Sequence, residues 1–161
     1  MLWEIRFLIW KFAVTIALAG ASIAISLHLS RPEQTVGRWG WLLAIPVGLL
    51  GIGIMGDIMT PQRTTWSARL IGNNSRACVM AIPLLSLPVL AAALLALRHG
   101  APSRPALAGA FAGLLAAGLA AAIYASHCTD DLPLFVATWY TLAIGAVAAL
   151  GAFAGSKMLK Y

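Results

Sequence analysis

Five long apolar runs, separated by short polar segments, dominate the pattern of hydrophobic and polar positions along the chain. Each run has about the 20 residues that a helix needs to cross a bilayer. The pattern predicts an all-α fold, a polytopic membrane helix bundle that forms a single transmembrane domain over residues 1–161. The five predicted transmembrane helices cover about 7–29, 39–56, 76–97, 105–126 and 132–155.

The first two runs contain residues that are unusual inside a membrane. Lys11 lies one turn inside the first predicted helix, and we expect its ammonium group to extend to the headgroups rather than to be buried and functional. The second run carries Pro46 and four glycines between Gly48 and Gly56. Close helix contacts in membranes tolerate such residues, so we expect this helix to be bent, packed inside the bundle and ended by Asp57.

The longest polar connection runs over residues 57–76. Within it, Trp66 and Leu70 lie one helical turn apart and Gly72 follows them, which favours a short helix on the membrane surface. A disordered loop is the alternative. Ser75 is then the predicted N-cap of the third transmembrane helix.

Glycines in the fourth predicted helix indicate close packing against a neighbour. Gly109 and Gly113 are four residues apart, and Gly151 and Gly155 repeat this spacing. Pairs of small residues at this spacing let the backbones of neighbouring membrane helices approach closely.

The composition agrees with a membrane protein. The 161 residues are 61% hydrophobic and 10% charged, with a mean hydropathy of +0.88, whereas a soluble domain is about 25% charged. The net charge of +6 fits cationic residues that anchor helix ends at lipid headgroups. We therefore expect membrane lipids as partners and no direct binding of nucleic acid.

The orientation is predicted from the Lys and Arg residues outside the apolar runs. One side of the membrane, with the first and third connections and the tail, has Arg31, Arg38, Arg98, Arg104, Lys157 and Lys160. The other side has Arg6, Lys11, Arg63, Arg69 and Arg76. This small excess predicts a multi-pass membrane protein with a cytoplasmic C-terminus. A surface facing a cytoplasmic partner is then expected at Arg31, Arg38, Arg98 and Arg104; the alternative is that these arginines only anchor helix ends.

The chain has two cysteines. Cys78 lies in the first turn of the third predicted helix, and Cys128 follows the end of the fourth. Because antiparallel neighbours have these two ends on the same side, both thiols are expected at one face, the periplasmic one. The positive end of the helix dipole favours a thiolate in the first turn, so we expect Cys78 to be the more reactive thiol.

This cysteine pair is the leading candidate for a functional site, as a sensor that forms a disulfide or binds a metal. His127 beside Cys128 adds a second type of ligand, which together with thiolates suits Cu(I) or Zn. We expect no required cofactor, and transient Cu or Zn binding at Cys78, Cys128 and His127. The alternative is that the two cysteines are unrelated small residues packed at helix ends.

The sequence gives little support to catalysis. It contains no HExxH, GxSxG, P-loop or Cys-x-x-Cys motif, so we predict that the protein is not an enzyme. We also find none of the buried carboxylates expected inside a proton-coupled transporter. A small membrane transporter or channel subunit is therefore the second functional hypothesis.

Several stretches carry a family resemblance. They are CVMAIPLLSLPVL, then RHGAPSRPALAGAFAGLLAAGLAAAIYASHC, and then DDLPLFVATWY with its glycine-rich last helix and basic tail. With FLIWKFAVTIALA and the SRP that follows its helix, they resemble the NrsF family of bacterial integral-membrane anti-sigma factors. The similarity covers nearly the whole chain and is most specific over residues 75–140.

The resemblance implies a function and a difference at the N-terminus. Members are six-helix membrane proteins that hold down an extracytoplasmic-function sigma factor, and their two outward-facing cysteines, here Cys78 and Cys128, take part in sensing metal or oxidative stress. A cytoplasmic N-terminal segment, implicated in holding the sigma factor, and one more helix would precede Met1. We therefore expect either a truncated start or sigma-factor binding by the remaining cytoplasmic loops.

Overall fold

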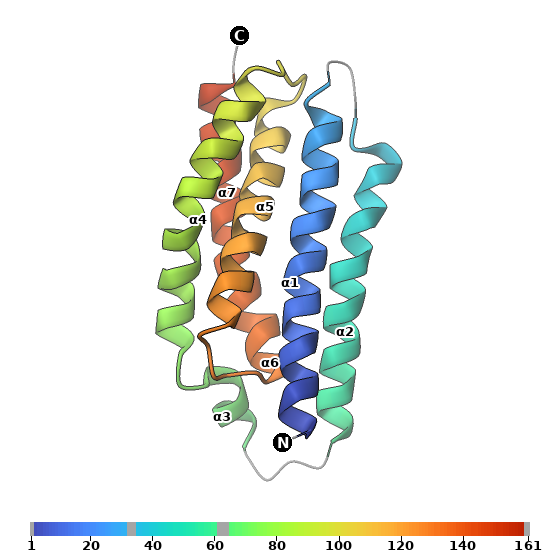
Figure 1. Cartoon of the computed structure of the whole chain (residues 1–161), viewed down its shortest axis with the longest axis vertical. Coiled ribbons are helices and arrows are strands. Elements are labelled where there is room, and N and C mark those ends of the chain that lie inside the picture. Colours follow the sequence, from blue (N-terminus) through green and yellow to red (C-terminus); the bar gives the residue numbers. More distant parts are fainter. Residues whose placement is uncertain (1, 32–34, 61–64, 160–161) are drawn as a thin grey trace.

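The structure is a computed structural model that describes residues 2–31, 35–60 and 65–159. In chain order its elements are α1 (Leu2–Leu29), the 3₁₀ helix η1 (Gly37–Leu43), α2 (Ala44–Met59), α3 (Trp66–Ile71), α4 (Ser75–Arg98), α5 (Pro105–Ala125), α6 (Pro133–Phe135), the π-helix η2 (Val136–Tyr140) and α7 (Thr141–Met158). The long helices run alternately up and down, so that α1 begins and α7 ends at opposite ends of the bundle (Figure 1). The described residues form no strand, which confirms the predicted all-α fold.

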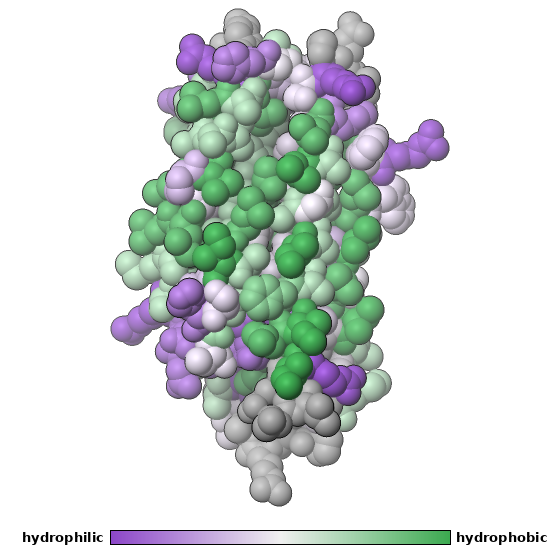
Figure 2. Space-filling view, viewed as in Figure 1, coloured by the Kyte–Doolittle hydropathy of each residue, from purple (hydrophilic) through white to green (hydrophobic). Residues whose placement is uncertain are grey.

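The outer surface of the bundle is suited to lipid. Within the described residues, five helices are long and apolar enough to cross a membrane: Ile5–Leu29, Gly37–Met59, Trp66–Arg98, Pro105–Ala125 and Pro133–Met158. Large apolar side chains such as Ile52, Leu84 and Leu142 are exposed on the outside. Figure 2 shows apolar residues across the middle of the bundle and hydrophilic residues toward both ends. The predicted membrane helix bundle is confirmed.

The two ends of the bundle differ chemically. The cysteine end comprises residues 5–11, 57–60, 65–78 and 125–135, at the bottom of Figure 1. It holds the start of α1, all of α3 and α6, and both cysteines. The basic end comprises residues 29–31, 35–43, 97–105 and 156–159, at the top of the same view.

Helix α5 forms the centre of the bundle. It packs against α1, α4 and α7, and most extensively against α7. Its glycines Gly109 and Gly113 face Gly151 and Gly155 of α7. A Cβ added at Gly113 would lie 2.6 Å from the carbonyl oxygen of Val147, and one added at Gly155 would lie 2.8 Å from the Cα of Gly109. No side chain fits between these backbones, so the close approach predicted from the glycine spacing is confirmed.

Helix α2 lies at the periphery, and the prediction that it is packed inside the bundle is wrong. Only 17% of its most apolar stretch is buried in the protein, against 56% for α5. A Cβ added at Gly48, Gly51 or Gly56 would meet nothing within 4 Å. Only Gly53 makes a close contact, because the indole ring of Trp10 packs on it and donates its N–H to the α2 backbone at 2.7 Å. Glycine content alone does not distinguish a packed face from an exposed one.

The local predictions for the polar connection have different outcomes. Helix α3 forms and ends at Gly72, whose φ of +56° lies in the region that favours glycine. The predicted cap is wrong, because Ser75 is the first residue of α4 and Asn74 holds the N-cap position without a side-chain capping bond. Helix α2 also continues past Asp57 to Met59.

We predict that Gly151→Ala destabilises the bundle by about 1–3 kcal/mol, because the added methyl group would overlap the Gly109 backbone. The matched control is Gly145→Ala on the same helix, where a Cβ would meet nothing within 4 Å. Thermal unfolding in detergent measures both variants. Equal melting temperatures would contradict the close contact between α5 and α7.

Candidate functional site

Cys78 and Cys128 lie together at the cysteine end in one buried apolar cluster. Cys78 is 0% exposed, Cys128 is 6% exposed, and both are free thiols. The other buried members of the cluster are Ile82, Ala120, Ala121, Ala125, Phe135, Val136, Tyr140 and Ala143. The prediction that both thiols lie at the same end of the bundle is confirmed, and their role in sensing stays a prediction.

Burial changes the expectation that Cys78 is the more reactive thiol. Cys78 is the fourth residue of α4, and its backbone N–H already donates to the Asn74 carbonyl at 2.8 Å. It is therefore not one of the free donors that carry the positive charge of a helix start. Reagents reach a fully buried thiol only when the cluster opens. Cys128 lies on a non-helical segment nearer the surface, so burial favours Cys128 as the accessible thiol.

Lys11 is buried, and the expectation that its ammonium group reaches the headgroups is wrong. Its side chain is 0% exposed. Nζ forms an ion pair with the carboxylate of Asp131 and donates a hydrogen bond to the Cys128 carbonyl oxygen at 3.0 Å. Burying an ammonium group is costly unless it is paired and hydrogen-bonded, and these two contacts meet both conditions. The partner lies 120 residues away in the sequence, so no local pattern reveals it.

Asp130 ties the segment that carries Cys128 to the start of α4. Its Oδ2 accepts hydrogen bonds from the backbone N–H groups of Asn73 at 3.0 Å and Asn74 at 2.8 Å. The Asn74 side-chain amide donates to the Thr129 hydroxyl at 3.3 Å. Asp130 therefore binds, from a distant segment, the two backbone N–H groups that precede α4, and it places a negative charge at the positive end of the helix dipole.

A second buried ion pair joins α2 to α3. Asp57 is 0% exposed and pairs with the guanidinium group of Arg69. Arg69 also donates to the Asp57 carbonyl oxygen at 3.2 Å and lies over the Trp66 ring, 5.3 Å from its centroid. The statement that the helices lack buried carboxylates is therefore wrong. The sequence predicts that Asp57 ends a helix. It lies instead inside α2, and the guanidinium group of Arg69 in the short helix α3 neutralises its charge.

His127 does not join the two cysteines. Its side chain is exposed, and its Nδ1 lies 3.0 Å from the Ser126 hydroxyl oxygen. Among the residues that the structure describes, no group of three or more His, Cys, Asp or Glu side chains is placed to hold a metal ion. The conformation described here therefore gives no support to a site that includes His127. Transient binding of Cu or Zn by the two thiols stays a prediction.

The four arginines predicted to face a partner lie at the basic end. Arg31 follows α1, Arg38 belongs to η1, Arg98 ends α4, Arg104 precedes α5, and all four side chains are exposed. Lys157, near the end of α7, adds a further exposed cation. The described residues of this end include no Asp or Glu. The charged side chains that the structure describes at the basic end are thus all cations.

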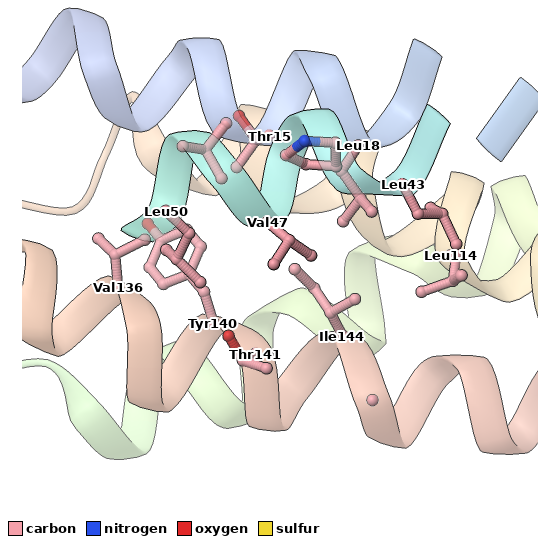
Figure 3. A pocket seen from close by; sticks show the side chains of 13 residues that line it. Thr15, Leu18, Leu43, Val47, Leu50, Leu114, Val136, Tyr140, Thr141 and Ile144 are labelled. Atoms are coloured by element: carbon pink, nitrogen blue, oxygen red, sulfur yellow. The ribbon is translucent and has the colours of Figure 1, made fainter. Parts of the chain in front are cut away.

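A cavity of about 280 Å³ lies between α1, α2, α5 and α7 (Figure 3). Apolar side chains such as Leu18, Leu50 and Ile144 line it. Val47 also lines it and is 67% exposed, so the cavity opens on the outer surface of the bundle. Tyr140, the last residue of the π-helix η2, belongs both to this lining and to the cysteine cluster. The lining suits a hydrocarbon chain better than a polar solute.

The five apolar helices and the exposed apolar belt define the chain as a polytopic membrane protein. The chain belongs to the NrsF family, described as negative regulator of sigma F, whose model matches residues 2–161. This membership confirms the family resemblance of the sequence. The family is regulatory rather than catalytic.

Two relatives support the assignment. The chain is 36% identical over 155 residues to the anti-sigma-F factor NrsF of Caulobacter vibrioides, which covers 94% of this chain and 72% of the relative. It is 34% identical over 152 residues to the probable anti-sigma-F factor NrsF of Azospira oryzae, with 94% of this chain and 71% of the relative covered. No solved structure gives a significant match.

We predict that Asp57→Asn lowers the stability of the protein by about 3–5 kcal/mol, because it leaves the buried Arg69 guanidinium group without its counter-ion. The matched control is Arg76→Gln, which removes an exposed cation at the same end and should change stability by less than about 0.5 kcal/mol. Thermal unfolding in detergent measures both. An Asp57→Asn variant as stable as the control would show that the pair contributes nothing.

Proposed function

We propose that this protein is a membrane-embedded anti-sigma factor. It holds an extracytoplasmic-function sigma factor inactive and releases it when Cys78 and Cys128 respond to a metal or an oxidant. The observation that carries the proposal is family membership over residues 2–161, together with two relatives named as anti-sigma-F factors. The extracytoplasmic-function class of the partner rests on the family resemblance alone.

In this proposal the protein lies in the bacterial inner membrane, with the basic end in the cytoplasm and the cysteine end in the periplasm. The exposed cations of the basic end support this orientation. At the cysteine end, Lys11 and Arg69 are neutralised inside the protein by Asp131 and Asp57. Buried and paired cations do not contact anionic headgroups. The two ends therefore differ more in exposed positive charge than the count of six against five Lys and Arg residues in the sequence indicates.

The basic end is also the proposed docking surface for the sigma factor. Its exposed arginines come from two separate connections, α1 to α2 and α4 to α5, that converge at one end of the bundle. A surface of one charge sign attracts a partner that presents acidic residues, and electrostatic complementarity of this kind sets specificity and the association rate.

The cysteine pair is the proposed sensor. A disulfide requires the two Cα atoms to lie within about 7 Å, and both thiols already belong to one cluster. Cys78 is fixed within α4, whereas Cys128 lies on the non-helical segment after α5 and has more freedom to move. Formation of a disulfide would transfer two electrons and two protons to the oxidant. A Cu or Zn ion would instead bridge the two sulfur atoms.

The second hypothesis, a small transporter or channel subunit, has one observation in its favour: the chain buries charged side chains at Lys11, Asp57 and Arg69. Each of these charges is held in an ion pair within the protein, however. The cavity between the helices is lined by apolar groups and includes none of the three. Solute flux through proteoliposomes would favour this hypothesis.

Reversing the charge of all four arginines, Arg31, Arg38, Arg98 and Arg104, to Glu should release the sigma factor, because repulsion replaces attraction at the docking surface. We expect co-purification of the sigma factor from detergent to fall at least about tenfold, equivalent to about 1.4 kcal/mol of binding. Sigma-dependent transcription should rise correspondingly.

The matched control for this prediction is Arg76→Glu at the cysteine end, which should keep full repression. Since loss of basic residues can reverse topology, a C-terminal reporter fusion must show the same orientation in both variants. Retained repression by a correctly inserted quadruple variant would leave the arginines with an anchoring role only. Absence of any sigma factor bound to the unaltered protein would refute the proposed function.

Cys78→Ser and Cys128→Ser should each abolish the response to metal or oxidant while leaving repression intact without inducer. The double variant should be no worse than either single one, because the two thiols act as a unit. A sigma-dependent reporter with and without inducer measures the response. A double variant that still responds normally would exclude the cysteine pair as the sensor.

A further inference from the structure

The Lys11 ammonium group contacts the segment that carries one of the two thiols. It binds this segment at two points, the Cys128 carbonyl oxygen and the Asp131 carboxylate. The first contact is made with the cysteine residue itself, so any displacement of the Cys128 backbone changes it directly. Lys11 is fully buried, so its ammonium group does not anchor α1 at the headgroups, and its two contacts serve to hold the Cys128 segment.

We propose that Lys11 is a positioning residue that latches the Cys128 segment to α1, and that a change at the cysteine pair reaches the basic end by releasing this latch. The proposal rests on the proposed function as an anti-sigma factor. It adds a residue outside the cysteine pair and identifies the helix that carries the signal.

The segment after α5 is held from two sides. Asp130 binds it to the start of α4 through the backbone N–H groups of Asn73 and Asn74, and Lys11 binds it to α1. Residues 128–132 form no helix, so these contacts fix their position. A disulfide or a metal that moves the backbone of Cys128 changes both sets of contacts, those of Asp130 with the start of α4 and those of Lys11 on α1.

Helix α1 is suited to carry such a change. It is continuous from Leu2 to Leu29, and the part beyond Lys11 spans roughly 27 Å at 1.5 Å per residue. At the basic end, the Ser30 carbonyl oxygen packs against Gly100, where an added Cβ would lie only 2.8 Å away. Gly100 lies in the turn between Arg98 and Arg104. The end of α1 therefore contacts the turn that carries half of the proposed docking arginines.

Lys11→Met tests the latch, since it keeps the length of the side chain and removes the charge. In a Cys78→Ala background, we expect the rate of Cys128 labelling by N-ethylmaleimide in detergent to rise at least about tenfold, because the segment opens more often. In cells, Lys11→Met should raise sigma-dependent transcription without inducer. The matched control, Arg76→Met, removes an exposed cation from the same end and should change neither measurement.

A thiol in a different buried cluster distinguishes a general loss of stability from release of the latch. Leu94→Cys, in a chain with Cys78→Ala and Cys128→Ala, reports on opening of a different buried cluster. If Lys11→Met raises labelling of this thiol by the same factor, Lys11 merely stabilises the bundle and the proposal is overturned. If Lys11→Met fails to insert, Lys11→Met with Asp131→Asn removes both charges of the ion pair and carries the same expectations.

The remaining outcomes also decide the proposal. Unchanged labelling of Cys128 refutes the latch, and faster labelling with unchanged transcription refutes the coupling to the basic end. If the unaltered protein does not repress sigma-dependent transcription, the proposed function is refuted instead. The labelling measurement needs no sigma factor, so it would still establish whether Lys11 holds the Cys128 segment.

Discussion

The direct contact between the backbones of α5 and α7 is the constraint on which the rest of the bundle depends. Glycines on both helices leave no side chain between them, and this places α5 at the centre with α1 and α4 on its remaining sides. The backbones of α5 and α1 also approach closely, because a Cβ added at Gly118 of α5 would lie 3.0 Å from the backbone nitrogen of Ala19. The chain leaving α5 therefore emerges between the starts of α1 and α4, which brings Cys128 beside Cys78.

The sequence alone predicts the features that depend on one segment at a time. Apolar length predicts the five helices, alternation of direction predicts that both cysteines share an end, and glycine spacing predicts close backbone approach at Gly109 and Gly113. These predictions succeed because length, direction and backbone access are local properties. The same local analysis recognises the short helix at Trp66–Ile71.

The errors all concern contacts between distant segments. Lys11 looks like a headgroup anchor until Asp131 is placed beside it, and Asp57 looks like a helix end until Arg69 folds back onto it. The cap expected at Ser75 does not form, and Asp130, more than fifty residues later, binds the backbone N–H groups of Asn73 and Asn74 just before α4. The glycines of α2 indicate packing as strongly as those of α5 do, yet most of them face open space. A single sequence does not specify which distant partner satisfies a polar group or fills a groove.

These long-range contacts are distributed unequally between the two ends. At the cysteine end, the charges of Lys11, Asp131, Asp57 and Arg69 are paired, and Asp130 accepts backbone hydrogen bonds. The segment around the thiol pair moves only when these specific contacts break. A chemical change at the thiols therefore has a defined structural consequence. At the basic end, the described cations have no acidic neighbour and remain exposed. Cations that are not neutralised within the chain are available to a second molecule. One end thus holds a single arrangement through internal contacts and the other leaves its charges open to a partner, which is the arrangement that the proposed function requires.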